Sequence, residues 1–304
     1  MKEISSFTST RTHHSKKFAE KKRKKMIVLI CAATLFGGVA ITAFAFLVRA
    51  PFLQVHTVVV EGSTFVPKEK IEAATLASLS GNYFHIVPFG STLFLSKSRI
   101  RDSITHSFKE LQDFSIHRTG LSQITLSLEE RVPAAIVCAG FRDDSVDDTC
   151  FWSDKHGYVF NSLASTTETL ATTASDSSFS NFSLKDYDHY YIPTDAGDIK
   201  IGENFIEEKT FQNLEKFVKG AAKGGLFPLG VLVGDNGEYE MYIQNKKDPS
   251  EVTIYFDDHA PFDTTLSNLL TFWQNPSTGK KATTTESFDY INLRFGNTVY
   301  YSTQ

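Results

Sequence analysis

The sequence has few cysteines and lacks the short motifs that mark common enzyme active sites. Three cysteines among 304 residues are too few for a disulfide scaffold. The chain contains no Gly-x-Ser-x-Gly segment, no His-Glu-x-x-His pair and no phosphate-binding Gly-Lys-Ser/Thr loop. Cysteine and histidine do not pair at zinc-ligand spacing. The sequence therefore shows no motif for an active site or a zinc site, although a triad built from distant residues leaves no such signature.

Residues 26–48 contain no charged residue. As an α-helix, these 23 residues reach roughly 34 Å, which is enough to cross a hydrocarbon core of about 30 Å. A cleaved signal peptide is the alternative, because Ala43-Phe44-Ala45 resembles a small-x-small cleavage site. The apolar run is longer than the 7–15 residues of a signal h-region. The sequence therefore predicts an uncleaved transmembrane helix over 26–48.

The charges on the two sides of this segment differ in sign. Residues 1–25 hold nine Lys and Arg against two acids, and the rest of the chain holds 22 Lys and Arg against 33 Asp and Glu. The positive-inside rule places residues 1–25 in the cytoplasm, where we expect a disordered basic tail that also contacts anionic lipid. The acidic remainder, outside the cytoplasm, argues against binding nucleic acid and is long enough for one or two domains.

Residues 51–131 show the pattern of a small α+β domain, with the element order β-α-α-β-β. Pro67 precedes a helix over 68–78, and Ser96 is the expected N-cap of a second helix reaching residue 110. A packed connection over 82–95 joins the two helices. The strands are expected at 55–60, 113–118 and 124–129, and in the last of these Ile124, Leu126 and Leu128 face inward.

Residues 132–304 are expected to form a β-rich domain. Strands are predicted at 134–139, 150–153, 158–160, 230–233, 238–244, 251–256, 288–295 and 298–302, and ordered structure is expected to resume at 187–192. Helices are predicted at 207–223 and, capped by Asp263, at 264–274. Asp235-Asn236-Gly237 predicts a hairpin turn. In 161–183, twelve of 23 residues are Ser or Thr, which predicts a mobile surface insertion.

Cys138 and Cys150 stand at the ends of two expected antiparallel strands. Outside the cytoplasm they can form a disulfide that closes a 13-residue loop, worth ~3 kcal/mol in the chain-entropy picture. Two buried thiols are the alternative. Four aspartates at 143–148 lie in the same loop, but their spacing lacks the order of a calcium loop, so a solvated acidic loop is expected.

Four segments together resemble the FtsQ/DivIB family of bacterial cell-division proteins. They are the strand and glycine at 58–62 (VVVEG), the strand and Glu-Arg-Val-Pro-Ala-Ala at 124–135, the Asp-Lys-His-Gly-Tyr-Val-Phe segment at 154–160 and the Tyr-Ile-Asn-Leu-Arg-Phe strand at 290–295. Asn292 stands where the family usually has an acid, and Phe295 stands where a Tyr is common. The resemblance implies that 51–131 is a POTRA (polypeptide-transport-associated) domain and that 132–304 is the family's C-terminal domain.

The resemblance also implies a function without catalysis. Such proteins bind single-pass coiled-coil partners of the FtsL and FtsB types at the division septum and help to control septal peptidoglycan synthesis. A C-terminal edge strand can accept a partner strand, with Arg294 pairing a carboxylate and aromatic side chains forming buried contacts. The expected partner-binding residues are Tyr290, Asn292, Arg294, Phe295, Val299 and Tyr300. Alternatively, these residues only complete the protein's own sheet.

Two other functions remain open at the level of sequence. A POTRA-bearing secretion or outer-membrane assembly factor would have several tandem modules or a β-barrel, and the chain shows one module. A membrane-anchored envelope hydrolase would need a nucleophile and a base. The apolar helix and the family resemblance together lead us to expect a single-pass protein of the bacterial cell membrane that is enriched at the septum.

Overall fold

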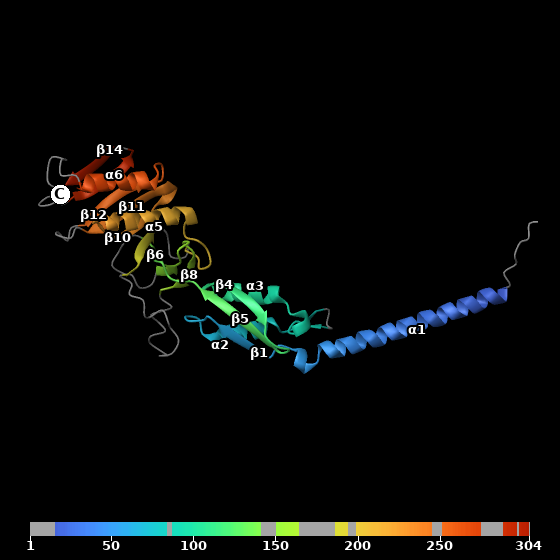
Figure 1. The fold of residues 1–304 in the computed structure, drawn as a ribbon. Coiled ribbons are helices and arrows are strands. Elements are labelled where there is room, and N and C mark those ends of the chain that lie inside the picture. The colour runs from blue at the N-terminus through green and yellow to red at the C-terminus, as the bar shows by residue number, and fades with distance from the viewer. Residues whose placement is uncertain are drawn as a thin grey trace, which may run out of the picture.

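The computed structural model describes residues 16–83, 87–140, 150–163, 186–193, 199–244, 251–274, 288–296 and 298–303, with backbone only for 16–20. One long helix leads into a small sheet unit, residues 51–131, which is followed by a large sheet unit, residues 132–303 (Figure 1). The fold is thus an N-terminal apolar helix followed by a mixed α/β region and a large sheet, which agrees with the coarse layout expected from sequence.

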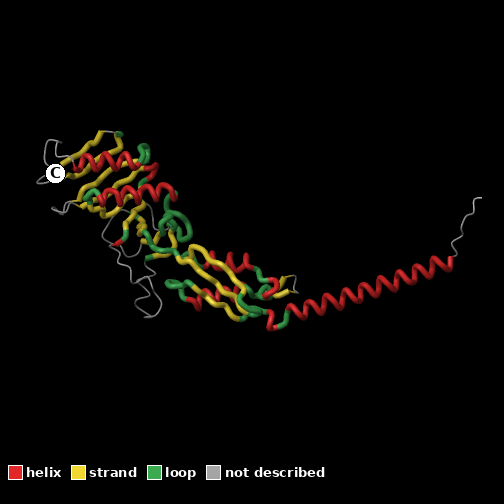
Figure 2. The backbone as a smooth tube through the Cα atoms, in the orientation of Figure 1, coloured by secondary structure: helices red, strands yellow, loops and turns green. Residues whose placement is uncertain are grey.

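The first helix, α1, runs from Lys16 to Val48 and projects away from the sheet units, which it meets at its C-terminal turns (Figures 1 and 2). Its segment Lys21–Val48 is long and apolar enough to cross a membrane, and the apolar window is not buried by the protein. The prediction of a disordered tail is wrong for residues 16–25, which are helical. Lys, Arg and Glu are good helix formers, and adding turns to an existing helix avoids a new nucleation step. Residues 1–15 lie outside the described chain.

The small sheet unit has three main strands in the order β1-β5-β4, with β1 parallel to β5 and β4 antiparallel to it. Ile71 and Ile100 from the two helices pack on Ile124 and Leu126 of the central strand, and all four are fully buried. The elements are β1 (Thr57–Glu61), α2 (Lys68–Ser78), α3 (Lys97–Ser107), β4 (Leu111–Arg118) and β5 (Gln123–Glu130). The β-α-α-β-β order expected from sequence is therefore present.

The second helix of this unit is shorter than predicted. It ends at Ser107, because Phe108 adopts extended backbone angles and Leu111 already pairs with Glu130 in the sheet. Ser96 precedes the helix but its side chain makes no capping hydrogen bond. The connection before it contains the short elements β2 (Asn82–Tyr83), β3 (Val87–Pro88) and η2 (Thr92–Phe94), while η1 (Pro51–Leu53) follows α1.

The nine described strands of the large sheet unit form one sheet in the order β14-β13-β12-β11-β10-β9-β6-β7-β8. Their bounds are β6 (Ala135–Ala139), β7 (Cys150–Ser153), β8 (Val159–Ser162), β9 (Asp188–Ile192), β10 (Phe227–Val233), β11 (Glu238–Gln244), β12 (Glu251–Asp257), β13 (Phe288–Phe295) and β14 (Thr298–Thr303). The predicted hairpin is confirmed: β10 and β11 are antiparallel, and the turn holds Asn236 and Gly237 at positive φ.

Two helices, α5 (Glu208–Lys223) and α6 (Phe262–Gln274), lie side by side over one face of this sheet (Figure 1). Phe217 stacks on Phe256 of β12 with ring centroids 4.4 Å apart, in the centre of the main core. Asp263 was the predicted cap of α6, but the helix begins one residue before it, at Phe262. The carbonyl of Pro261 instead accepts the first amide bonds, from Thr264 and Thr265.

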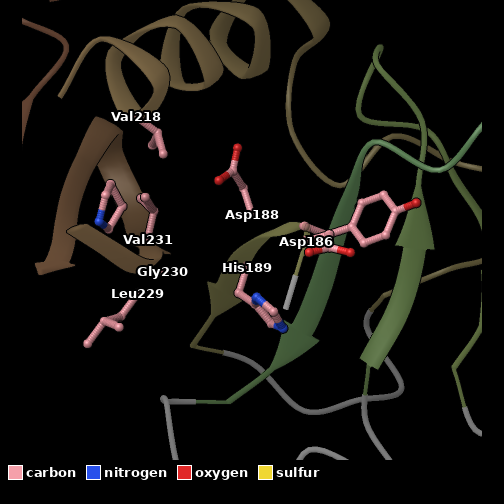
Figure 3. Close-up of a pocket in the computed structure, with 9 residues that line it drawn as sticks. Asp186, Asp188, His189, Val218, Leu229, Gly230 and Val231 are labelled. Atoms are coloured by element: carbon pink, nitrogen blue, oxygen red, sulfur yellow. The ribbon is translucent and has the colours of Figure 1, made fainter. Parts of the chain in front are cut away.

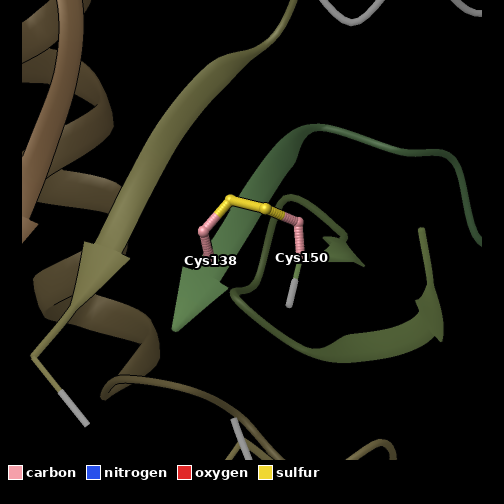
Figure 4. Close-up of a disulfide and its surroundings, with 2 residues drawn as sticks. All are labelled: Cys138 and Cys150. Carbon is pink, nitrogen blue, oxygen red and sulfur yellow. A yellow bond between two sulfur atoms is a disulfide. The ribbon is translucent and has the colours of Figure 1, made fainter. Parts of the chain in front are cut away.

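A second core lies on the opposite face of the sheet, over β6 to β9. Trp152 and Phe160 are buried there beside the disulfide that joins Cys138 of β6 to Cys150 of β7 (Figure 4). The predicted insertion begins too early in the chain, because Asn161 and Ser162 belong to β8 and residue 163 is buried. Its remainder and the four aspartates at 143–148 fall outside the described residues.

Candidate functional site: the edge of the large sheet

The last described strand, β14, forms one edge of the large sheet, since β13 is its only neighbour among the strands that the structure describes. β13 is parallel to β12 on its other side. An edge strand presents a row of backbone N–H and C=O groups on its outer side, to which another extended chain can pair. The outer side of β14 is therefore a candidate docking edge.

The expected residues Phe295 and Tyr300 lie together at this edge. A register shift between Asn292 and Phe295 opposes two residues of β13 to one of β14. Because side chains alternate along a strand, this bulge moves Phe295 to the face that Tyr300 occupies. The two rings meet edge to face at 5.0 Å, and their side chains are 58% and 53% exposed. They form an exposed aromatic pair whose geometry the alternation of the sequence alone does not predict.

Arg294 is held in place beside this pair by groups from two inner strands. Its Nη1 lies 3.6 Å from a carboxylate oxygen of Glu238, and its guanidinium carbon lies 5.2 Å from the ring centroid of Tyr255. Its Nε is buried and has no hydrogen-bond partner among the described residues. A buried N–H without a partner costs free energy, so the described residues do not fully satisfy this side chain.

The other three expected residues take different positions. Tyr290 packs edge to face on Tyr255 at 6.0 Å, and the side chain of Asn292 accepts the backbone amide of Arg294 at 3.1 Å. Both are half-buried on the helix-free face. Val299 instead packs against the main core, on the side of the sheet that α5 and α6 cover. Val299 therefore contributes to the sheet rather than to the exposed pair.

Sequence reasoning missed the inner residues that extend this face. The strand registers align Glu240, Tyr255, Asn292 and Tyr300 in one row across four strands. Tyr242 lies one row away and donates a hydrogen bond to Glu240 at 3.1 Å. Burial, followed by the charge of Glu240, raises the pKa of both Tyr242 and Tyr255. The alternation of apolar and polar residues in 238–244 and 251–256 indicates which side chains of each strand share a face. It does not indicate that residues of different strands form one row, because that alignment depends on the strand order.

The opposite face of the edge hairpin is partly covered by the protein itself, although Tyr301 on this face is 46% exposed. The ring centroid of Tyr301 lies 5.2 Å from that of Phe272 of α6 and 5.6 Å from that of Phe288. The amide of Asn268, also on α6, donates to the carbonyl of Gly296 at 3.2 Å and supports the turn before β14. The two alternatives, partner binding and completion of the protein's own sheet, therefore apply to different residues of this hairpin. The face toward α6 packs on the protein, and the face that carries Phe295 and Tyr300 is exposed.

A small cavity of about 100 Å³ lies between β9, β10 and α5 (Figure 3). Asp188 and His189 point to opposite sides of β9 there, so they do not form one constellation (Figure 3). Burial raises the pKa of Asp188. Within the described ranges no three His, Cys, Asp or Glu side chains come together in a way that suits a metal ion. The edge of the sheet is the better candidate.

These features define a class of protein: one apolar helix long enough to span a membrane, followed by an α+β unit and a large sheet with an open edge. No family model matches the chain, and no curated protein matches it.

Proposed function

We propose that this protein is a bitopic division scaffold of the FtsQ/DivIB type, in which the small sheet unit is a POTRA-like domain. It binds a single-pass coiled-coil partner of the FtsL or FtsB type and acts through protein contacts rather than catalysis. In this proposal residues 1–25 are cytoplasmic, both sheet units are extracytoplasmic and the protein gathers at the septum. The resemblance in the four sequence segments supports the family.

The observation that carries the proposal is the exposed aromatic pair formed by Tyr300 on the edge strand β14 and Phe295 at the end of β13. Exposed aromatic rings that become buried on binding are frequent hot spots, and the unpaired edge supplies backbone bonds in register. Arg294 adds a cation whose Nε has no hydrogen-bond partner in the part of the chain that the structure describes. An acidic, apolar segment of a partner that adds a strand beside β14 satisfies all three features.

Site-specific photocrosslinking tests this edge directly. A photoreactive phenylalanine analogue is placed at Phe295 or Tyr300 in dividing cells, and at Val132 as the matched control. Val132 is 67% exposed but precedes β6, which the strand order places beyond β9 and away from β14. We expect the first two positions to trap a small single-pass coiled-coil protein and the control to trap none. Recovery of no such protein at Phe295 and Tyr300 would count against the scaffold.

Phe295→Glu separates binding from folding. The side chain is 58% exposed, so its replacement should change the free energy of unfolding by less than about 0.5 kcal/mol. Loss of an aromatic hot spot should weaken partner binding by about 2 kcal/mol, roughly 30-fold in Kd. Fluorescence microscopy should then show the partner dispersed from midcell. Val132→Glu, at a position 67% exposed and distant from the edge, is the control. Unfolding of the Phe295 variant would show that the residue only completes the sheet.

A further inference from the structure

Four large apolar side chains are exposed at the end of the small sheet unit that adjoins α1. They are Phe52, Leu93, Phe94 and Leu121, which we call the apolar tip, and their exposed fractions lie between 46% and 65%. Exposed apolar clusters of this kind usually mark a surface that another apolar phase covers. None of the four belongs to the candidate edge of the large sheet.

Hydrogen bonds hold the three segments of the apolar tip together. The hydroxyl of Thr92 donates to the carbonyl of Leu53 at 2.9 Å and to the carbonyl of Leu121. Arg118 in turn donates to the carbonyl of Thr92. Thr92 is itself 1% exposed, so these hydrogen bonds form inside the protein. The apolar side chains around it are therefore presented by a fixed framework formed by η1, η2 and the turn after β4.

The tip also lies alongside the last turns of the apolar helix. Phe94 packs edge to face on Phe44 of α1, with ring centroids 6.0 Å apart. Phe44 stands four residues before Val48, where α1 ends, and hence about 6 Å along the axis from that end. If α1 crosses the bilayer with its apolar stretch in the hydrocarbon, Phe94 lies at the depth of Phe44 rather than in water.

We infer that the apolar tip is inserted in the lipid of the same membrane that α1 spans. Its depth matches the 5–10 Å to which apolar faces of interfacial segments enter the boundary between headgroups and acyl chains. The lipid, rather than a second protein, is chosen as the occupant because the tip is continuous with the spanning helix. Such an insertion holds the small sheet unit upright on α1 and fixes the direction in which the large sheet unit extends. This inference rests on the membrane-spanning part of the proposed function.

Quenching by lipids with brominated acyl chains tests it. The full-length chain is reconstituted in vesicles of phosphatidylcholine and phosphatidylglycerol, with Leu93→Trp or Leu121→Trp as reporter. The native Trp152 and Trp273 lie in the large sheet unit and supply the background emission. We expect brominated lipid to reduce the added emission of both reporters, with a blue-shifted maximum. Val132→Trp, which is equally exposed but lies after β5, should show neither effect.

Two further variants make each outcome decisive. The emission of Phe36→Trp, in the middle of α1, must be quenched by brominated lipid. If it is not, α1 does not span the membrane, and the result contradicts the proposed topology rather than the insertion of the apolar tip. With Phe36→Trp quenched, unquenched reporters at both Leu93 and Leu121 would overturn the insertion alone. Protection of these reporters from aqueous iodide without lipid quenching would also overturn it, in favour of a protein covering the tip. Adding Leu93→Glu to the Leu121→Trp variant should abolish quenching while the circular dichroism spectrum is unchanged.

Discussion

Arg131 joins the two sheet units through a buried ion pair, and its replacement gives the sharpest test of the fold. It follows β5, and its Nη1 donates to the carboxylate of Asp154 in the turn between β7 and β8. Its guanidinium carbon lies 3.8 Å from the ring centroid of Tyr158, and its Nε donates to the carbonyl of Lys109 at 3.2 Å. The side chains of Arg131 and Asp154 are only 15% and 5% exposed.

Arg131→Met keeps the aliphatic stem against Tyr158 but removes the charge. Asp154 then retains the backbone amides of His156 and Tyr158, at 2.8 and 3.1 Å, and loses its counter-charge. Removing one partner of a buried pair typically costs 3–5 kcal/mol, because the other charge stays out of water. The remaining amide bonds solvate the carboxylate in part, so we expect a loss of about 3 kcal/mol in the free energy of unfolding.

Arg101 offers a matched control on the surface of the small sheet unit. It also pairs with an aspartate, Asp113 at 3.6 Å, and also lies over a ring, that of Phe114 at 4.9 Å. Its pair is 56% and 70% exposed, and water and salt screen such a pair strongly. Arg101→Met should therefore cost at most about 1 kcal/mol.

Urea unfolding of the full chain in detergent micelles, followed by the fluorescence of buried Trp152, measures both losses. The double variant Arg131→Met with Asp154→Asn closes a thermodynamic cycle, and we expect it to be more stable than Arg131→Met alone. A loss for Arg131→Met no larger than for Arg101→Met would refute the reasoning. Strictly additive losses in the cycle would refute it as well, since residues in direct contact should couple by 0.5–3 kcal/mol.

Three further changes test the large sheet unit. Replacing Cys138 and Cys150 together by Ala should lower the free energy of unfolding by ~3 kcal/mol, and non-reducing mass spectrometry of the parent should show the linked peptides. Free thiols at both positions would contradict the bond. Tyr190→Phe should stabilise the protein by about 1 kcal/mol, because the buried hydroxyl has no hydrogen-bond partner among the described residues. Asp188→Asn should stabilise it at pH 7 but not near pH 3. Burial raises the pKa of this carboxyl above 3.8, so the folded state binds the proton more tightly and loses stability as the pH rises through the folded pKa. Equal effects at both pH values would contradict that origin.

The glycine after β1 shows how far a single residue in the sequence can predict a constraint. Gly62 directly follows β1, and the structure holds it at φ +84°, where an added Cβ would collide with the carbonyl of Leu128. The next residues form a loop that Glu130 fastens, since its carboxylate accepts the amides of Thr64, Phe65 and Val66. Sequence indicates the glycine, but only tertiary structure brings Glu130 to the loop.

By itself the sequence determined the features that depend on neighbours along the chain. An uncharged run of 23 residues determines a helix able to span a membrane, and the alternation of Ile124, Leu126 and Leu128 determines which face of β5 is buried. The same local logic placed the turn at Asp235–Gly237. These results follow from helical rise, strand periodicity and backbone preference, each of which acts within a few residues.

Tertiary structure alone decided which strand is left at the edge and which side chains remain exposed there. The bulge that brings Phe295 beside Tyr300, and the row from Glu240 to Tyr300, depend on pairing between strands that are distant in sequence. The early end of α3 has the same origin, because pairing of Leu111 with Glu130 outweighs a helical apolar stripe. Hydrogen bonds between strands and burial of their faces are non-local, so no window of the sequence contains the free energies that choose among these arrangements.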